Sequence, residues 1–357
     1  MTSIKITSEA LRSIESYTVD LDNIGFGKCM APTMIVADYS DGKWGDLEMV
    51  PYGNLTLSPT CKVFHYAQEI FEGMKAYRID GKGPLLFRPF ENAKRFNISA
   101  ERMVMPSIDE ELFVESVKVM ASHCRNFIPT KTGESLYIRP FMFATEEHLG
   151  IKPADQFKYM VLASPSGAYF SSDSIKIQVE RRYTRACPGG TGYAKTGGNY
   201  AASLKAVKEA RERGYDQTLW LDAEHKRYLE ELSGMNIFCL INGELHTPAM
   251  TESILDGITR RSLIDLARSF GITVHETRMD IDELISQIQN GSCTEAFACG
   301  TAAIITPIGT FGETDGKTYE LKENFGPIAK KLRDGLLAIQ EGRSEDPFNW
   351  IVDLSKQ

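Results

Sequence analysis

The chain has 357 residues, enough for two domains, and its 42% hydrophobic and 25% charged content is ordinary for a globular protein. Its net charge of −8 argues against nucleic acid or an anionic membrane as a partner, so local groups must hold any anionic ligand. Seven scattered cysteines without a C-x-x-C pair favour a reduced, cytoplasmic location, and six scattered histidines show no metal-ligand spacing, so no metal is expected.

The N-terminal half predicts a small α+β domain that spans residues 1–165. Residues 1–25 are interpreted as a lead-in and residues 44–56 as irregular. Apolar periodicity and turn residues predict strands at 34–39, 72–78, 85–87, 136–143 and 157–163, and helices at 90–103 and 108–124.

A stretch rich in Ser, Gly and Pro predicts an interdomain connector at residues 166–174, followed by a larger domain at 175–357. Asn242-Gly243 is a strong hairpin signal. The predicted strands are 175–179, 218–221, 228–232, 237–241, 244–246 and 294–298, and the predicted helices are 201–210, 258–270, 281–290 and 324–340.

The segment from Gly189 to Tyr200 places Lys195 among five glycines, directly before a predicted helix with Asn199 as its N-cap. Most lysines are solvated surface residues. The alternative is a Schiff-base lysine, whose amine must be partly desolvated or placed beside a cation to lose its proton near neutral pH. Features elsewhere in the chain favour this second interpretation.

Four features match the needs of pyridoxal phosphate. Glu231 ends a hydrophobic strand, where a buried carboxylate can face a ring nitrogen. Gly257 precedes a helix start, where free N–H groups favour an anion, and Gly300-Thr301 offers N–H groups and a hydroxyl after a strand. Arg95 lies on a helix with apolar neighbours and can point inward at an anion. Each feature has an ordinary structural alternative; together with the lysine they indicate this cofactor.

These blocks resemble the branched-chain amino-acid aminotransferases, which are fold-type IV pyridoxal-phosphate enzymes. The resemblance runs from about residue 26 to 306 and is carried by 71–77, 137–140, 195–200, 234–238 and 300–302. It implies a small α/β N-terminal domain and a larger, β-barrel-like α/β C-terminal domain, with pyridoxal 5′-phosphate between them. It also implies a homodimer that transfers amino groups reversibly between L-leucine, L-isoleucine or L-valine and 2-oxoglutarate.

The resemblance assigns roles to individual residues. Lys195 would form the Schiff base and carry protons, Tyr200 would bind the phenolic oxygen, and Glu231 would keep the pyridine nitrogen protonated. The implied cofactor-binding residues are completed by Arg95, Arg185, Gly257, Ile258, Thr259, Gly300 and Thr301. The implied substrate residues are Phe26, Tyr66, Phe71, Tyr137, Tyr169 and Ala302, with Arg139 for the 2-oxoglutarate side chain and Leu149 and Ile151 in a loop that reaches the partner's site.

Two departures from the family pattern stand out. Ala303 and Thr306 replace a redox C-x-x-C of the mammalian members, so no thiol switch is expected, and Gly234 replaces a frequent threonine. An apolar pocket separates substrates that differ by one methylene by only about 1–3 kcal/mol, so all three branched substrates are expected.

Three other functions remain open at this point. A D-amino-acid aminotransferase or an aminodeoxychorismate lyase would share the lysine and the glutamate but not the 71–75 block. A cofactor-free Schiff-base lyase would use Lys195 but has no need of a phosphate site. A non-catalytic binding protein would keep the fold but would not require the lysine, tyrosine and glutamate that catalysis needs.

Overall fold

The computed structural model describes residues 4–22, 24–167 and 174–356, and the chain forms two compact units. The first unit comprises Met1–Tyr169, Ala194–Gly197 and Ala338–Gln357, and the second comprises Phe170–Tyr193 and Gly198–Leu337. This division differs from the predicted domains because the short segment with the lysine and the C-terminal segment make their contacts within the first unit. The predicted boundaries at residues 165 and 175 stay a prediction.

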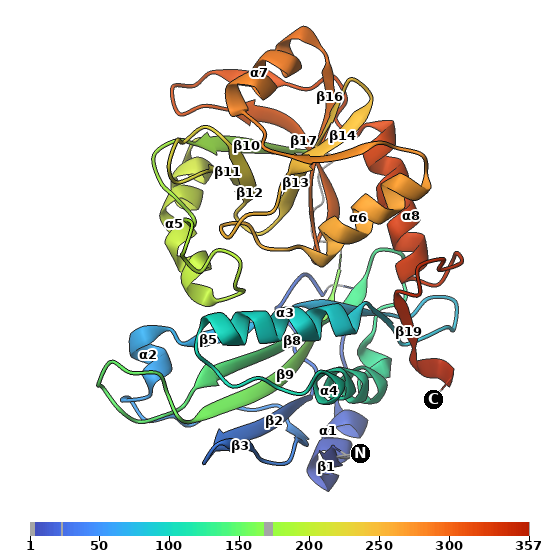
Figure 1. The fold of residues 1–357 in the computed structure, drawn as a ribbon. Coiled ribbons are helices and arrows are strands. Elements are labelled where there is room, and N and C mark those ends of the chain that lie inside the picture. Colours follow the sequence, from blue (N-terminus) through green and yellow to red (C-terminus); the bar gives the residue numbers. More distant parts are fainter. Residues whose placement is uncertain (1–3, 23, 168–173, 357) are drawn as a thin grey trace. The chain divides into compact units, whose positions relative to one another are not determined.

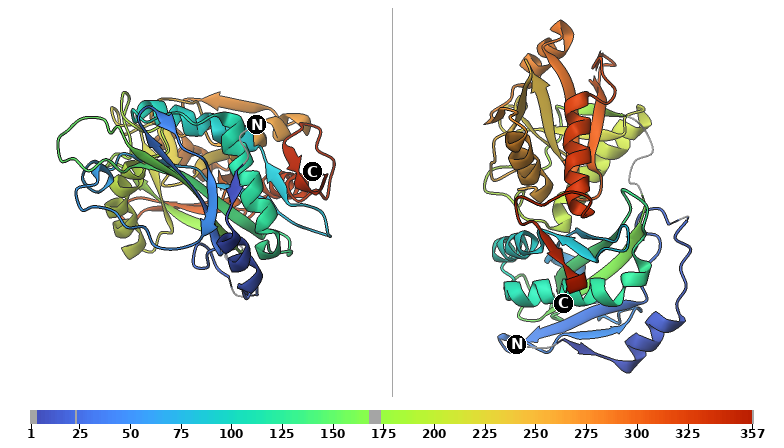
Figure 2. Two further views of the ribbon diagram at one scale, coloured as in Figure 1. Left: turned by 90° about the horizontal axis from the view of Figure 1, so that it is seen from below. Right: turned by 90° about the vertical axis from the view of Figure 1, so that its right-hand side faces the viewer.

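The first unit is built on a ten-stranded sheet with the order β1-β4-β2-β9-β8-β6-β7-β19, in which β3 pairs with β2 and β5 with β8. The β1–β4 pair is parallel and the others are antiparallel. Figure 2 shows the dark red β19 beside the cyan β7, although they are far apart in the chain. The strands are β1 (Lys5–Ile6), β2 (Thr33–Ser40), β3 (Lys43–Trp44), β4 (Glu48–Pro51), β5 (Glu69–Phe71), β6 (Met74–Tyr77), β7 (Leu85–Phe87), β8 (Ser135–Ala144), β9 (Phe157–Ser166) and β19 (Ile351–Asp353).

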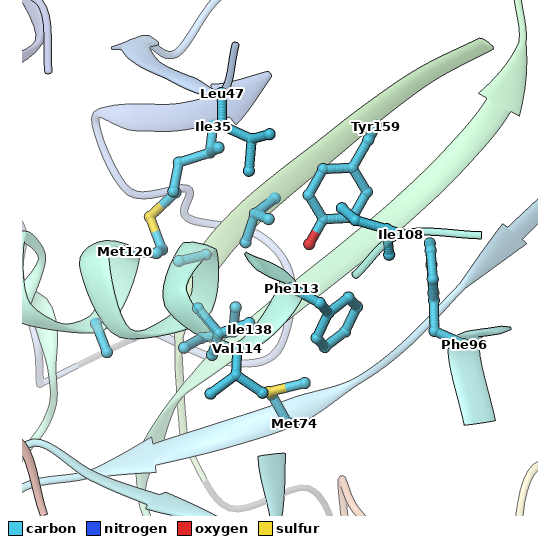
Figure 3. Close-up of a cluster of buried hydrophobic side chains, with 14 of the residues drawn as sticks. Ile35, Leu47, Met74, Phe96, Ile108, Phe113, Val114, Met120, Ile138 and Tyr159 are labelled. Atoms are coloured by element: carbon cyan, nitrogen blue, oxygen red, sulfur yellow. The ribbon is translucent and has the colours of Figure 1, made fainter. Parts of the chain in front are cut away.

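Two helices of the first unit, α3 (Pro89–Arg102) and α4 (Glu110–His123), pack on each other and cover one face of this sheet (Figure 1). The side chain of Asp109 starts α4 by accepting a hydrogen bond from the amide of Leu112 at 3.0 Å. The core between helices and sheet contains fully buried aromatic and aliphatic side chains such as Phe96, Phe113 and Tyr159 (Figure 3). The shorter helices are α1 (Ser8–Ser16), α2 (Lys62–Tyr66) and the 3₁₀ turns Arg125–Phe127 and Leu354–Lys356.

The second unit is built on a nine-stranded sheet with the order β12-β11-β10-β17-β16-β13-β14-β15, and β18 pairs with β17. The β10–β11, β10–β17 and β14–β15 pairs are parallel, so the sheet is mixed. The strands are β10 (Ile175–Glu180), β11 (Gln217–Leu221), β12 (Leu229–Leu232), β13 (Asn236–Ile241), β14 (Glu244–Pro248), β15 (Val274–Thr277), β16 (Cys293–Gly300), β17 (Ile304–Gly312) and β18 (Thr318–Glu320).

The remaining helices are α5 (Gly197–Glu212), α6 (Ile258–Ser269), α7 (Ile281–Asn290) and α8 (Pro327–Gln340). Both α6 and α7 contact β16, and every residue of β13 is buried, so this part of the sheet is covered on both faces (Figure 1). Among the described residues no helix combines the length and the apolar content needed to cross a bilayer.

Several sequence predictions were wrong in detail. The lead-in at 1–25 contains α1, the irregular stretch at 44–56 contains β4, and β15 and β17 were not predicted as strands. Asn199 is not the N-cap of α5, because the helix already includes Gly197. Its side-chain amide instead exchanges two 2.7 Å hydrogen bonds with Thr191, which ties the glycine-rich loop to the helix.

Candidate active site

The backbone on both sides of Lys195 is fixed by hydrogen bonds to β5 and α3. Its carbonyl accepts a hydrogen bond from the amide of Phe71 at 3.0 Å, and its amide donates to the hydroxyl of Ser99 at 2.9 Å. Thr196 donates its hydroxyl to the carbonyl of Glu69 at 2.7 Å, and the amide of Gly197 donates to the Glu69 carboxylate. The lysine side chain therefore extends from an immobilised main chain, and its Nζ lies 4.8 Å from the ring centroid of Phe71.

Arg95, predicted to hold phosphate, makes a two-point ion pair in the same unit. Its Nε and Nη2 donate to the two carboxylate oxygens of Glu72 at 2.7 and 2.8 Å. Asn92 donates to the same carboxylate at 2.7 Å, and both charged side chains are buried. Glu72 was not predicted as a site residue. The sequence signal that could have identified it is a charged residue inside an otherwise apolar strand segment. The phosphate role of Arg95 stays a prediction.

Four of the predicted substrate residues lie together in the first unit. The rings of Phe26 and Tyr137 meet edge to face at 5.1 Å, and the Arg139 guanidinium lies 4.6 Å from the ring centroid of Phe71. Arg139 also donates to the Tyr137 hydroxyl at 3.0 Å. The buried Nε of Arg139 has no hydrogen-bond partner within the described residues, so this cation has donor capacity for an anionic ligand.

The close approach of Tyr137 depends on Gly73. A Cβ atom at position 73 would overlap with the Tyr137 hydroxyl. The Phe71-Glu72-Gly73 block therefore supplies an aromatic wall, the carboxylate partner of Arg95 and the space for a second aromatic hydroxyl.

The other predicted substrate residues are more exposed. Tyr66 donates its hydroxyl to the carbonyl of Leu149, while Leu149 and Ile151 are 56% and 91% exposed. Tyr169 lies outside the described residues, so its predicted role is untested.

Glu231 and Arg185 form a second buried ion pair, in the second unit. The Arg185 Nη2 lies 2.9 Å from Glu231 Oε1, and both side chains are 6% exposed. Asn236 donates to the other carboxylate oxygen at 3.1 Å, and the amide of Leu255 donates to it at 3.3 Å. The burial expected for a ring-facing carboxylate is present. Its role toward a pyridine nitrogen stays a prediction.

The start of α6 has the form of an anion site. Gly257 is the N-cap residue, so no side chain at the cap position accepts a hydrogen bond from the first amides of the helix. The next two residues, Ile258 and Thr259, are buried. The first amides of a helix have no acceptor within the helix, and its dipole favours negative charge there. A Cβ at position 257 would overlap with the side chain of Asn236, so any larger residue would have to displace that side chain.

The remaining cofactor candidates are half-buried. Gly300 ends β16, and Thr301 and Ala302 form the turn that leads into β17. Tyr200 lies in the first turn of α5, downstream of the lysine. Pyridoxal phosphate needs amide donors for its phosphate, a carboxylate for its ring nitrogen and an amine for its aldehyde. The start of α6, Glu231 and Lys195 offer these three groups, so the residues present fit this cofactor.

Comparison with known proteins decides the family. The sequence profile described as "Amino-transferase class IV" matches residues 69–311. The chain belongs to the class IV aminotransferases. It is therefore an enzyme that transfers amino groups, and the family uses pyridoxal phosphate, which confirms the predicted cofactor and the predicted fold-type IV class.

Individual class IV aminotransferases agree with this assignment. The chain is 48% identical to "Branched-chain-amino-acid transaminase 1" of Bacillus subtilis (strain 168), over 94% of this chain and 95% of the relative. A branched-chain aminotransferase from Thermoproteus uzoniensis, solved with norvaline, superposes with a TM-score of 0.75 at 28% identity, over 90% of this chain and 99% of that chain. The T.th. branched-chain enzyme complexed with N-(5′-phosphopyridoxyl)-L-glutamate gives a TM-score of 0.72 at 29% identity, over 89% of this chain and 98% of that chain.

Proposed function

We propose that this aminotransferase is a branched-chain-amino-acid transaminase, which moves an amino group reversibly between L-leucine, L-isoleucine or L-valine and 2-oxoglutarate. The observation that carries the proposal is the high identity, along almost the whole chain, to a transaminase of that name. The structural relatives with norvaline and with a glutamate adduct support the two substrate types.

The proposal assigns a task to each chemical group of the site. When bound, pyridoxal phosphate supplies the carbonyl carbon that exchanges with the amino group and a ring that withdraws electrons. Lys195 would hold the cofactor through its amine, and the same amine, when free, would move the proton at the substrate Cα. The Glu231 carboxylate would favour a proton on the pyridine nitrogen, and Tyr200 would donate to the phenolic oxygen. The amides of Ile258 and Thr259, the Thr301 hydroxyl and Arg95 would hold the phosphate.

Arg139 explains how one enzyme accepts apolar and acidic side chains. Phe26, Phe71 and Tyr137 present apolar ring surface that suits a branched aliphatic side chain. The second carboxylate of glutamate needs a charged or hydroxyl donor, because burying it unpaired is costly. The Arg139 guanidinium, which lies over the Phe71 and Tyr137 rings, is such a donor, and we assign it to 2-oxoglutarate recognition.

We also propose that the enzyme works as a homodimer in the cytoplasm. Leu149 and Ile151 are apolar and exposed, as expected for a loop that completes a partner's site. The seven cysteines are free thiols, which suits a reducing compartment. Light scattering after size exclusion tests the assembly: a dimer is expected, and Ile151→Asp should weaken it. A wild-type monomer at all concentrations would contradict it.

The substrate proposal is tested by a kinetic panel on the purified holoenzyme. L-Leucine, L-isoleucine and L-valine are each expected to react with 2-oxoglutarate, whereas D-alanine is not. The protein should show a visible absorbance band, and borohydride reduction followed by peptide mapping should label Lys195. Preferred turnover of D-alanine, or a label on a different lysine, would contradict the proposal.

A further inference from the structure

Glu244, His246 and His275 lie together at the edge of the sheet in the second unit. The parallel pairing of β14 with β15 sets His246 opposite His275, and β15 is the last strand of the sheet. Side chains two positions apart on a strand share a face, so Glu244 lies on the same face as His246. Two imidazoles and one carboxylate therefore point from two neighbouring strands to the same side.

The three side chains lie close enough together to be candidate ligands of one metal ion. The imidazole rings stack with centroids 4.6 Å apart, and His275 Nε2 lies 2.8 Å from Glu244 Oε2. One ligand atom from each of the three lies within 4.8 Å of the other two. An ion bound at about 2.0–2.2 Å from nitrogen and oxygen ligands can meet all three once the side chains rotate toward a common point, which includes turning the two imidazoles out of their stacked arrangement. In the parts of the chain that the structure describes, this is the one place where three such ligands converge.

The three side chains are open to solvent on one side. Glu244 is exposed and the two histidines are half-buried, so an ion can enter from solvent.

We propose that Glu244, His246 and His275 bind a divalent transition-metal ion, with Zn²⁺ as the reference ion, and that remaining coordination positions are filled by water. Imidazole and carboxylate together suit zinc, cobalt, nickel or copper, whereas calcium and magnesium prefer oxygen ligands alone. The ligands come from both β14 and β15, so the ion would join the edge strand to its neighbour. Because it binds only the folded arrangement, it would stabilise the fold.

The first test is calorimetric titration of untagged holoenzyme with zinc chloride. Wild type is expected to bind one ion per chain, and His246→Ala or His275→Ala should weaken binding about tenfold or more. His225→Ala is the matched control: this half-exposed histidine also lies beside a carboxylate, 3.1 Å from Asp222 Oδ2, but has no second imidazole in its group. It should bind zinc as wild type does.

The second test uses Glu244→Gln, which keeps the shape of the side chain. Cobalt chloride should give the wild type a d–d absorption spectrum that changes in this variant and disappears in the histidine variants. Zinc should raise the midpoint of thermal unfolding of the wild type, and a chelator should reverse the shift. Absence of saturable zinc binding up to millimolar concentration, or binding that all three substitutions leave unchanged, would overturn the proposal. Circular dichroism establishes that each variant is folded.

Discussion

Glu72 and Arg95 are joined by two parallel hydrogen bonds of 2.7 and 2.8 Å, with the carboxylate fully buried. Burial alone would raise the pKa of Glu72, but the charge and hydrogen bonds of Arg95 outweigh it, with a further contribution from Lys195, and the pKa is held below its usual range. A depressed carboxylate pKa contributes stability at pH values above the ordinary glutamate range. That contribution is lost as the pH falls through the lower folded-state pKa.

Glu72→Gln should therefore destabilise the cofactor-free protein, in which no phosphate lies near Arg95. The substitution leaves the Arg95 guanidinium buried without its counter-charge, and breaking a buried pair costs about 3–5 kcal/mol. Urea unfolding at pH 7 measures the loss. Glu91→Gln is the control, because Glu91 pairs with the exposed Lys94 at 3.1 Å, and it should change stability by less than about 1 kcal/mol. Equal losses of unfolding free energy in the two variants would show that the buried pair contributes no more stability than the exposed pair.

Lys195→Ala should abolish transamination while the protein stays folded. The hydrogen bonds that fix position 195 come from its backbone, so alanine keeps them. Loss of the amine removes the proton carrier, and turnover should fall by at least about 10²–10⁴-fold. Lys208→Ala, an exposed lysine on α5 that lies 3.8 Å from Glu212, should keep full activity. Turnover retained by the position-195 variant would refute the catalytic assignment.

Glu231→Gln should lower the single-turnover rate with little change in cofactor occupancy. The amide keeps the shape but not the charge that favours a protonated ring, so a loss of about 10²-fold is expected, as for removal of one electrostatic stabiliser. Glu230→Gln is the neighbouring control. Burial raises the pKa of Glu230, and its carboxylate accepts a hydrogen bond from Ser253, so removing its charge should matter less. An unchanged rate in the first variant argues against Glu231 as the ring partner.

Lys75→Met should remove an alkaline rise in stability. Burial lowers the pKa of Lys75 to about 8, although Glu341 opposes the shift. In the unfolded chain this lysine has its ordinary pKa of 10.5, so between about pH 8 and 10.5 the unfolded chain binds more protons than the folded protein. The free energy of unfolding therefore increases with pH across this range. The contribution is about 3 kcal/mol from the size of the shift. Urea unfolding from pH 7.5 to 10.5 measures it, and Lys94→Met should retain the rise.

Gly234→Thr should be tolerated. Gly234 is exposed and a Cβ there meets no atom within 4 Å, so the backbone accepts a side chain, and stability should stay within about 0.5 kcal/mol of wild type. Gly192→Ala provides the contrast, because its Cβ would lie 2.6 Å from the Ser253 Cα, and overpacking costs about 1–3 kcal/mol. Chemical unfolding of both variants is the measurement. A larger loss in the first variant would mean that glycine at 234 is structurally required.

The sequence determined the elements with strong periodicity and the residues with distinctive local chemistry. Helices α3, α4, α6 and α7 and most central strands were predicted within a few residues, because their apolar spacing and caps are local properties. The lysine among glycines and the glutamate at a strand end were predicted as site residues in the same way, and their roles stay predictions. Short edge elements such as β15 carry too few residues for a periodic signal.

Only the tertiary structure decided which distant residues meet. Glu72 could be read as a charged residue in an apolar strand, but its partner Arg95 lies 23 positions away, on α3. Scattered histidines gave no metal-ligand spacing, yet the parallel register of β14 and β15 sets His246 against His275. The physical reason is the same in both cases: spacing along the chain reports contacts within one helix or strand, whereas contacts between elements depend on pairing and packing that no local pattern encodes.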